Sequence, residues 1–150
     1  MLAALGPKML ELSRDRAWGA HPYLVPPEHT AIAREALGAD RVLAPEQSVF
    51  LGSDEAAGRA AAHAFVADYL RLPNYVNNLL RLGFREDEVQ GAGSERLVEA
   101  VVVWGDEQAI VDRIRAHHEA GADHVCIQVI GGEDEFPLEQ WRRLAPALLG

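Results

Sequence analysis

The sequence predicts an α/β protein in which about four parallel strands are joined by crossover helices. Three observations predict it: helical and strand periodicities alternate along the chain, the connections have the length of crossovers, and the last strand is apolar on both sides. A strand that is apolar on both sides is usually covered on both faces, which is typical of parallel sheets. The 150 residues are therefore expected to form one domain around one core.

The clearest helix–strand unit spans residues 105–132. Asp106 is a good N-cap residue, and apolar residues recur behind it at helical spacing through Ile114. Gly121 stands where a left-handed residue ends a helix, and the β-branched run DHVCIQVI follows at residues 123–130. This unit predicts a site beyond the C-terminal end of the strand, where α/β folds place their sites.

The elements before this unit show the same alternation. Gly6-Pro7 begins the first helix, because proline is already shaped for the first helical turn. Pro22 lies inside the second strand and lacks a ladder N–H, and Pro45 makes the start of the third strand irregular. Strands are expected at residues 1–5, 20–25 and 42–51, and helices at residues 7–18, 26–37 and 53–72.

A helical insertion is expected at about residues 73–104, inside a single domain of residues 1–150. Its first part is helical but broken and ends in an acidic, mobile loop that reaches Gly93. Ser94 then caps a helix that is expected to run through Trp104. A closing amphipathic helix follows the last strand.

Composition excludes several functional classes. The net charge of −9, from 23 acidic and 14 basic residues, disfavours nucleic acid and anionic membrane surfaces, which need a clustered basic face. The single cysteine, Cys126, excludes an intramolecular disulfide and is expected to pack as a small apolar residue, and no Cys/His cluster has metal-binding spacing. No apolar run reaches about 20 residues and the start lacks the features of a signal peptide, so a cytoplasmic protein is expected.

Chain length and strand number together favour half of a closed barrel. Four parallel strands with crossover helices can form an open sheet or part of a (β/α)8 barrel. A complete eight-stranded barrel usually needs about 250 residues, so four strands in 150 residues correspond to roughly half of one.

Two stretches resemble a known superfamily. The run LAALGPKMLEL at residues 2–12, followed by WGAHPY at residues 18–23, is similar to the fifth strand, following helix and sixth strand of the bacterial-luciferase-like superfamily. Within it, the similarity is greatest to the branch of coenzyme F420-dependent oxidoreductases. WGD at residues 104–106 and AGADHV at residues 120–125 resemble that family's last helix and eighth strand. The resemblance implies a TIM-type barrel of which this chain is the C-terminal half.

The resemblance also implies a cofactor site at the C-terminal mouth of the barrel. It assigns contacts with a deazaflavin or isoalloxazine cofactor to Ala4, Leu5, Gly6, Pro7, Lys8 and Tyr23. The chemistry of the Gly6 turn agrees, because glycine lets the backbone approach an anion and a helix N-terminus offers free N–H groups. Lys8 adds a positive charge in the first turn, which suits a cofactor phosphate. The alternative is that the Gly-Pro pair only begins a helix.

Three further residues are candidates for lining the pocket. His21 follows the second strand and is a candidate catalytic acid or base, because an imidazole exchanges protons near neutral pH. Glu46 and Gln47 lie in the third strand and are candidate substrate-pocket residues, since a carboxylate inside a barrel is costly unless it is paired. Packing is the alternative for each. His117 and His118 lie on a crossover helix and are expected to be solvated or half-buried rather than to bind a metal.

Three functional hypotheses follow. The first is hydride transfer between coenzyme F420 and a small organic substrate, the second is a monooxygenase that uses FMN, and the third is a non-catalytic half-barrel that acts as a remnant or assembly partner. In this superfamily the insertion can cover the active-site mouth, so Asn74, Asn77 and Asn78 either face the mouth or lie on the surface. The open sheet edges at Met1–Leu5 and Val125–Ile130 predict a homo-oligomer or a complementary N-terminal half-barrel.

Overall fold

The computed structural model describes residues 1–131 and 136–149, so Gly132 at the end of the predicted helix–strand unit lies outside the described residues. The elements, in chain order, are α1 (Pro7–Arg16), β1 (Gly19–Ala20), α2 (Pro27–Leu37), β2 (Val42–Leu43), β3 (Glu46–Leu51), α3 (Glu55–Tyr69), α4 (Pro73–Arg81), α5 (Glu95–Val101), β4 (Val102–Gly105), α6 (Glu107–Glu119), β5 (Cys126–Val129) and α7 (Leu138–Leu149). Every strand pairing among the described residues is parallel, as predicted. In these residues no helix combines the length and the apolar character that crossing a bilayer requires.

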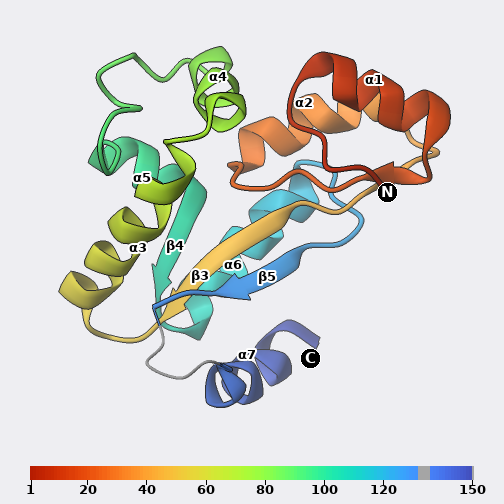
Figure 1. Ribbon diagram of the computed structural model, residues 1–150. Helices are drawn as coiled ribbons and strands as arrows, with labels where there is room; N and C mark the ends of the chain where they lie inside the picture. Colours follow the sequence, from red (N-terminus) through yellow and green to blue (C-terminus); the bar gives the residue numbers. More distant parts are fainter. Residues whose placement is uncertain (132–135, 150) are drawn as a thin grey trace.

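The strands form two parallel sheets, β1–β2 and β4–β3–β5, which the β2–β3 segment joins end to end. A parallel bridge joins Leu2 to Ala20, and β1 pairs with β2. The pairing continues beyond β2, because Ala44 and Glu46 donate their N–H groups to the carbonyls of Ala20 and Pro22 at 3.0 and 2.8 Å. The β2–β3 segment therefore runs as one long strand, with β5 along its other edge (Figure 1). Leu2, β1, the β2–β3 segment and β5 thus lie side by side in chain order, as in a barrel segment, and β4 is added on the edge of β3 opposite β5.

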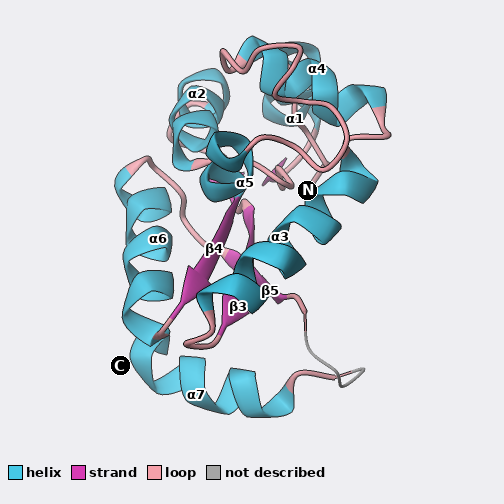
Figure 2. Cartoon of the chain, turned by 90° about the vertical axis from the view of Figure 1, so that its left-hand side faces the viewer, coloured by secondary structure: helices cyan, strands magenta, loops and turns pink. Residues whose placement is uncertain are grey.

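Helices cover both faces of the longer sheet. Figure 2 shows α3 on one side of β3, β4 and β5 and α6 on the other. Val49 and Leu51 pack with residues of α6 and α7, whereas Phe50 packs with residues of α3 and α5. Successive strand residues point to opposite faces, so this apolar run requires cover on both sides. A smaller core joins α1 and α2 to the short strands β1 and β2.

The two N-terminal strands are shorter than the sequence predicts. In the expected strand at residues 1–5, Leu2 alone forms a bridge, and the ladder of the expected strand at residues 20–25 ends at Ala20. Pro22 has no N–H to continue a ladder, and Leu24 turns the chain with a left-handed φ of 54°. The chain therefore leaves the sheet after Pro22, whose carbonyl still accepts the N–H of Glu46.

The prediction of a helix that runs through Trp104 is wrong for its last residues. The helix α5 ends at Val101, and residues Val102–Gly105 form β4, which pairs with the upper half of β3. Three consecutive valines explain the change, because β-branched side chains lose rotamer freedom in a helix and pack well in a strand. The insertion therefore returns to the sheet through a strand that the sequence analysis missed.

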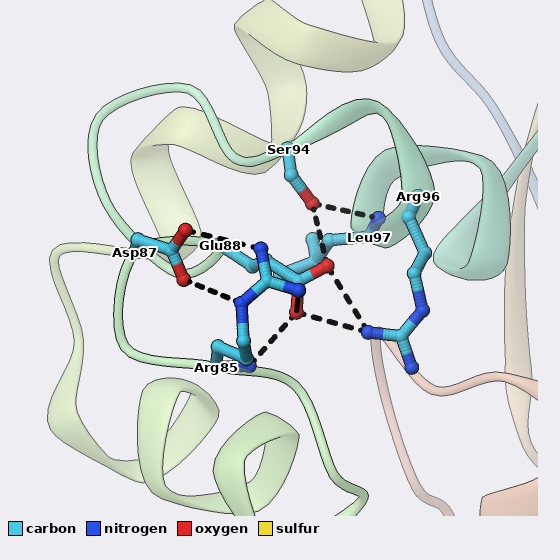
Figure 3. Close-up of polar contacts among 6 residues, drawn as sticks. All are labelled: Arg85, Asp87, Glu88, Ser94, Arg96 and Leu97. Carbon is cyan, nitrogen blue, oxygen red and sulfur yellow. Dashed lines mark hydrogen bonds and ion pairs between the residues drawn. The ribbon is translucent and has the colours of Figure 1, made fainter.

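The acidic loop between α4 and α5 is organised around a buried carboxylate (Figure 3). Glu88 is 3% exposed and accepts hydrogen bonds from the N–H of Arg85, from the guanidinium of Arg96 at 2.9 Å and from the hydroxyl of Ser94 at 3.3 Å. The Arg85 N–H and the Arg96 guanidinium keep the pKa of Glu88 below its usual range. Ser94 also caps α5 by accepting the N–H of Leu97. One carboxylate thus ties the start of this loop to the helix that follows it.

Candidate functional site

A pocket of about 390 Å³ opens where the chain leaves its first two strand segments. Its walls come from the segment after Leu2, from the segment after β1 and from one face of α4. The lining residues are Ala3, Ala4, Leu5, Gly6, Met9, His21, Tyr23, Asn74, Tyr75, Asn77 and Arg81. Pockets of this volume hold small organic molecules. The predicted residues Ala4, Leu5, Gly6, His21 and Tyr23 therefore lie around one cavity.

The backbone at Gly6 presents the start of α1 to this pocket. Gly6 is the N-cap residue, with an extended backbone, and no side chain caps the helix. The first turn contains no acidic residue, so the positive end of the helix dipole is not neutralised there. Pro7 and Lys8 follow in this exposed first turn and do not line the pocket. The start of α1 can therefore receive an anion through its backbone.

A buried histidine of α2 fixes the carbonyl of Leu5. The Nε2 atom of His29 lies 2.8 Å from the Leu5 oxygen, and because a carbonyl only accepts, Nε2 carries the proton. His29 is 2% exposed, and this burial lowers its pKa. The neutral ring thus anchors the backbone of the pocket wall to α2.

The ring of His21 is oriented by one hydrogen bond. Its Nδ1 atom lies 2.6 Å from the carbonyl oxygen of Ala44, so Nδ1 carries a proton and donates it. The Nε2 atom has no hydrogen-bond partner among the residues that the structure describes, and His21 lines the pocket. In the neutral ring this nitrogen carries a lone pair, which can accept a proton from a bound molecule.

Three tyrosines pack together beside the pocket, and two of them, Tyr23 and Tyr75, line it. The hydroxyl of Tyr23 donates to the carboxamide oxygen of Gln128 at 2.7 Å, so the hydroxyl of Tyr69, 2.8 Å away, must donate to Tyr23. Burial is the main cause that raises the pKa of Tyr23, followed by the hydrogen bond with Tyr69. The ring of Tyr75 lies edge-on to both tyrosines, with centroid distances of 5.0 and 6.4 Å. Tyr23 is therefore held as a neutral phenol at the edge of the pocket.

Glu46 lies beneath this pocket and does not line it. Its carboxylate accepts the hydroxyl of Ser48 at 2.5 Å and the backbone N–H of Leu24 at 3.2 Å. The second bond holds the left-handed turn at Leu24 that follows Tyr23. Glu46 is 3% exposed, and this burial raises its pKa to about 7, although both hydrogen bonds oppose the shift. The carboxyl holds the backbone next to the pocket in place. Its pKa lies near neutral pH, so it can gain or lose a proton there.

Gln47 points to the opposite face of β3, away from the pocket. Its carboxamide nitrogen donates to the carbonyls of Ser48 and Val101, so its oxygen accepts the Nε2–H of His117 at 3.0 Å. The other nitrogen of His117 then accepts the hydroxyl of Thr30 at 2.8 Å. His117 is fully buried, not solvated or half-buried as predicted. The described residues contain no group of three or more His, Cys, Asp or Glu side chains that could hold a metal ion.

Sequence comparison identifies the family. A profile of the luciferase-like monooxygenases matches residues 1–124. The chain belongs to this family. Among curated proteins, none matches the sequence.

Two solved structures share the fold of this luciferase-like chain. An F420-dependent secondary alcohol dehydrogenase, in complex with an F420–acetone adduct, is 16% identical with a TM-score of 0.65, and the alignment covers 97% of this chain and 47% of the dehydrogenase. The coenzyme F420-dependent tetrahydromethanopterin reductase from Methanopyrus kandleri is 19% identical with a TM-score of 0.63, covering 95% of this chain and 47% of the reductase. The chain thus spans about half the length of these structures and has the fold of the C-terminal half of a (β/α)8 barrel.

The sequence analysis left open whether the insertion lines the luciferase-like pocket, and it did not name Arg81. Asn74 and Asn77 line the pocket, which answers the question of mouth or surface, and Arg81 joins them one turn later. Asn78 is instead buried in the interior. The signal was present in the sequence, since positions 74, 77 and 81 share one helical face. The surface that this face meets depends on the tertiary position of α4, which the sequence pattern does not give.

Proposed function

We propose that this chain is the C-terminal half of an oxidoreductase that moves hydride between coenzyme F420 and a small organic substrate. One observation carries the proposal: the Gly6 turn, His21 and Tyr23 surround a single pocket beyond the ends of the first two strand segments. This is the position where barrel folds hold their ligands. The two F420-dependent structures with the same fold support the choice of cofactor.

The residues of the pocket fit a flavin-like cofactor that carries an anionic tail. Ala4, Leu5 and Gly6 would bring the backbone at the start of α1 to the anion, with Pro7 and Lys8 in the same turn. Tyr23 would contribute an aromatic and hydrogen-bonding wall. The cofactor, when bound, supplies the hydride chemistry.

His21 is the residue that we assign to proton transfer. Its Nδ1–H bond to Ala44 fixes the ring and leaves Nε2 on the side of the pocket without a partner among the described residues. A fixed nitrogen at this place can take a proton from, or return one to, a substrate oxygen. Glu46 and Gln47 are assigned supporting roles in place of direct substrate contact, because neither lines the pocket.

A second candidate function is an FMN-dependent monooxygenase, which the description of the matching family favours. The pocket alone does not distinguish the two, because F420 and FMN both carry a phosphate and a tricyclic ring. A non-catalytic half-barrel is the third candidate. It is favoured if the chain folds cooperatively and binds neither cofactor.

We further propose that the activity requires a second half-barrel, either a complementary N-terminal half or a second copy of this chain. The alignments support it, because this chain matches only 47% of each F420-dependent structure. In a closed barrel, both edges of the sheet must be paired.

Titration of the purified chain with each cofactor tests these assignments. We expect saturable quenching of F420 fluorescence with micromolar chain, and weaker or no binding of FMN measured by its own fluorescence. Tyr23→Phe should weaken F420 binding, because it removes the hydroxyl at the edge of the pocket. Tighter binding of FMN than of F420 would select the monooxygenase, and absence of binding for both would reject catalysis by the chain on its own.

A further inference from the structure

The exposed polar face of α4 lines the pocket. Asn74, Asn77 and Arg81 follow one another at intervals of three and four residues, and all of them line the pocket. The opposite face packs into the core through Leu79, and Val76 lies against the same core. Two carboxamides and a guanidinium thus line the same cavity as the segments that follow the strand ends.

Arg81 lies directly over the start of α1. Its Nη1 atom is 3.4 Å from the position that a β-carbon on Gly6 would occupy. Arg81 forms no ion pair or hydrogen bond with any other residue described by the structure, although the chain has 23 acidic residues against 14 basic ones. Its neighbours on the insertion, by contrast, are paired: Arg71 with Asp68, and Arg96 with Glu88.

The two positive features of the pocket repel each other unless an anion binds beside both of them. The N-terminus of α1 carries a partial positive charge, which favours anions and disfavours cations nearby. No acidic side chain in the first turn offsets this charge, and a full positive charge from α4 faces the same place. An anion bound beside both would be attracted by each of them and would offset their repulsion.

We infer that Arg81, with Asn74 and Asn77, binds the phosphate group of the ligand that occupies this pocket. A guanidinium fork and backbone N–H groups match the oxygens of a phosphate, and carboxamides can bind its remaining oxygens or neighbouring hydroxyls. The inference deepens the proposed function and rests on it for the identity of the ligand. The phosphate can belong to the cofactor or to a phosphorylated substrate.

The first experiment uses inorganic phosphate alone and reads NMR chemical shifts of the full chain. We expect phosphate to shift the amide signals of Gly6 and Lys8, and Arg81→Gln to weaken this binding by about tenfold because it removes a charged hydrogen bond. Arg71→Gln, which alters an exposed arginine outside the pocket, should leave phosphate binding unchanged. Equal phosphate affinity in the Arg81 variant and the wild type, or no shift at Gly6, would overturn the inference.

A second variant, at Gly6, tests the inference even if Arg81→Gln does not fold. Gly6 has a φ of −87°, which alanine adopts without strain, and the added methyl would meet the guanidinium at van der Waals distance. Gly6→Ala should therefore fold and still weaken phosphate binding. Unchanged affinity in this variant would count against a phosphate that contacts both the Gly6 turn and Arg81.

F420 titration separates this inference from the proposed function. If the wild type binds F420 and Arg81→Gln binds it equally well, the role of Arg81 is rejected and the proposed function stands. If phosphate binding depends on Arg81 but F420 does not bind, the phosphate site stands and the proposed function fails. Competition between phosphate and F420 assigns the site to the cofactor, and simultaneous binding assigns it to a phosphorylated substrate.

Discussion

The buried carboxyl of Glu46 holds the backbone turn at Leu24, and its protonation should make the free energy of unfolding depend on pH. The pKa of Glu46 is about 7 in the folded chain, against an ordinary value of 4.5, so the folded state holds this proton more tightly than the unfolded state. Its contribution to stability is complete below pH 4.5 and is lost as the pH rises through 7. The shift corresponds to about 3 kcal/mol over that range.

Glu46→Gln should remove this part of the pH dependence. The variant keeps an acceptor for the Leu24 N–H but has no proton to lose, so its unfolding free energy should change less between pH 5 and pH 8 than that of the wild type. Urea denaturation at both pH values measures the difference, with the exposed Glu11→Gln as control. Parallel pH profiles for the wild type and Glu46→Gln would contradict a raised pKa at this residue.

The buried hydrogen bonds that link Thr30, His117 and Gln47 give a second prediction at the scale of residues. Burial, then the charge of Arg113, lowers the pKa of His117 to about 4, so the folded state binds this proton less tightly and loses stability as the pH falls from 6.5 towards 4. Thr30→Val removes the donor to Nδ1 and leaves a buried acceptor unpaired, which should cost about 1–3 kcal/mol. Thr30→Ser keeps the hydroxyl and is the control. Equal unfolding free energies for the two variants would show that this bond is not needed.

The site residues that the sequence analysis named and that line the pocket were chosen because they follow predicted strands. Gly6, His21 and Tyr23 come directly after strand segments, and parallel strands bring such positions together. The side of the sheet that Gln47 faces depends on register, since neighbouring residues of a strand point to opposite faces. The contribution of Arg81 depends on the position of a whole helix. Sequence patterns therefore indicate which residues follow the strands, whereas contacts between distant segments of the chain depend on the tertiary structure.

At the scale of elements, β4 shows where periodicity fails. Leu97, Val98 and Val101 fit a helical stripe, and the apolar run continues through Val102 to Trp104 without a break, so a short strand could not be separated from the preceding helix. The β-branched residues and Gly105 were the available signal. The partner strand β3 decided the outcome through its parallel pairing with β4.

The packing of α3 against β4 gives a prediction in which two known effects oppose each other. Alanine is favoured over glycine inside a helix by about 1 kcal/mol. At Gly58, however, a β-carbon would lie 2.8 Å from Cβ of Trp104 and 3.1 Å from Cδ1 of Phe50. Overpacking of this kind costs about 1–3 kcal/mol, so Gly58→Ala should destabilise the chain on balance.

Thermal and urea denaturation of Gly58→Ala measure this balance. Ala60→Gly, at an exposed position of the same helix, gives the propensity difference without the contact. A gain in stability for Gly58→Ala equal to the loss for Ala60→Gly would mean that α3 can move away from Trp104 freely, and that the helix and strand are not closely packed.

At the scale of the whole molecule, the parallel half-barrel was predictable. Its two open edges leave backbone hydrogen-bonding groups without a strand to pair with. One edge lies beside Leu2, and the other is β5, whose residues are all partly exposed. Cys126 and Ile130 donate their N–H groups to β3, so the alternate residues Ile127 and Val129 direct theirs outward. Open parallel edges are templates for another strand.

Association of two half-barrels would pair both edges at once. Rotation by half a turn about the barrel axis brings the β5 edge of one copy beside the Leu2 edge of the other and keeps all strands parallel. We therefore expect sedimentation at tens of micromolar to give a dimer or larger species, in the absence of a complementary N-terminal half. Val129→Pro removes one outward N–H, because proline has no donor, and should shift the population towards monomer. Val129→Ala loses the same side-chain packing but keeps the N–H, so it should remain associated; a monomeric wild type, or equal dissociation of the two variants, would show that the edge of β5 does not hold the assembly together.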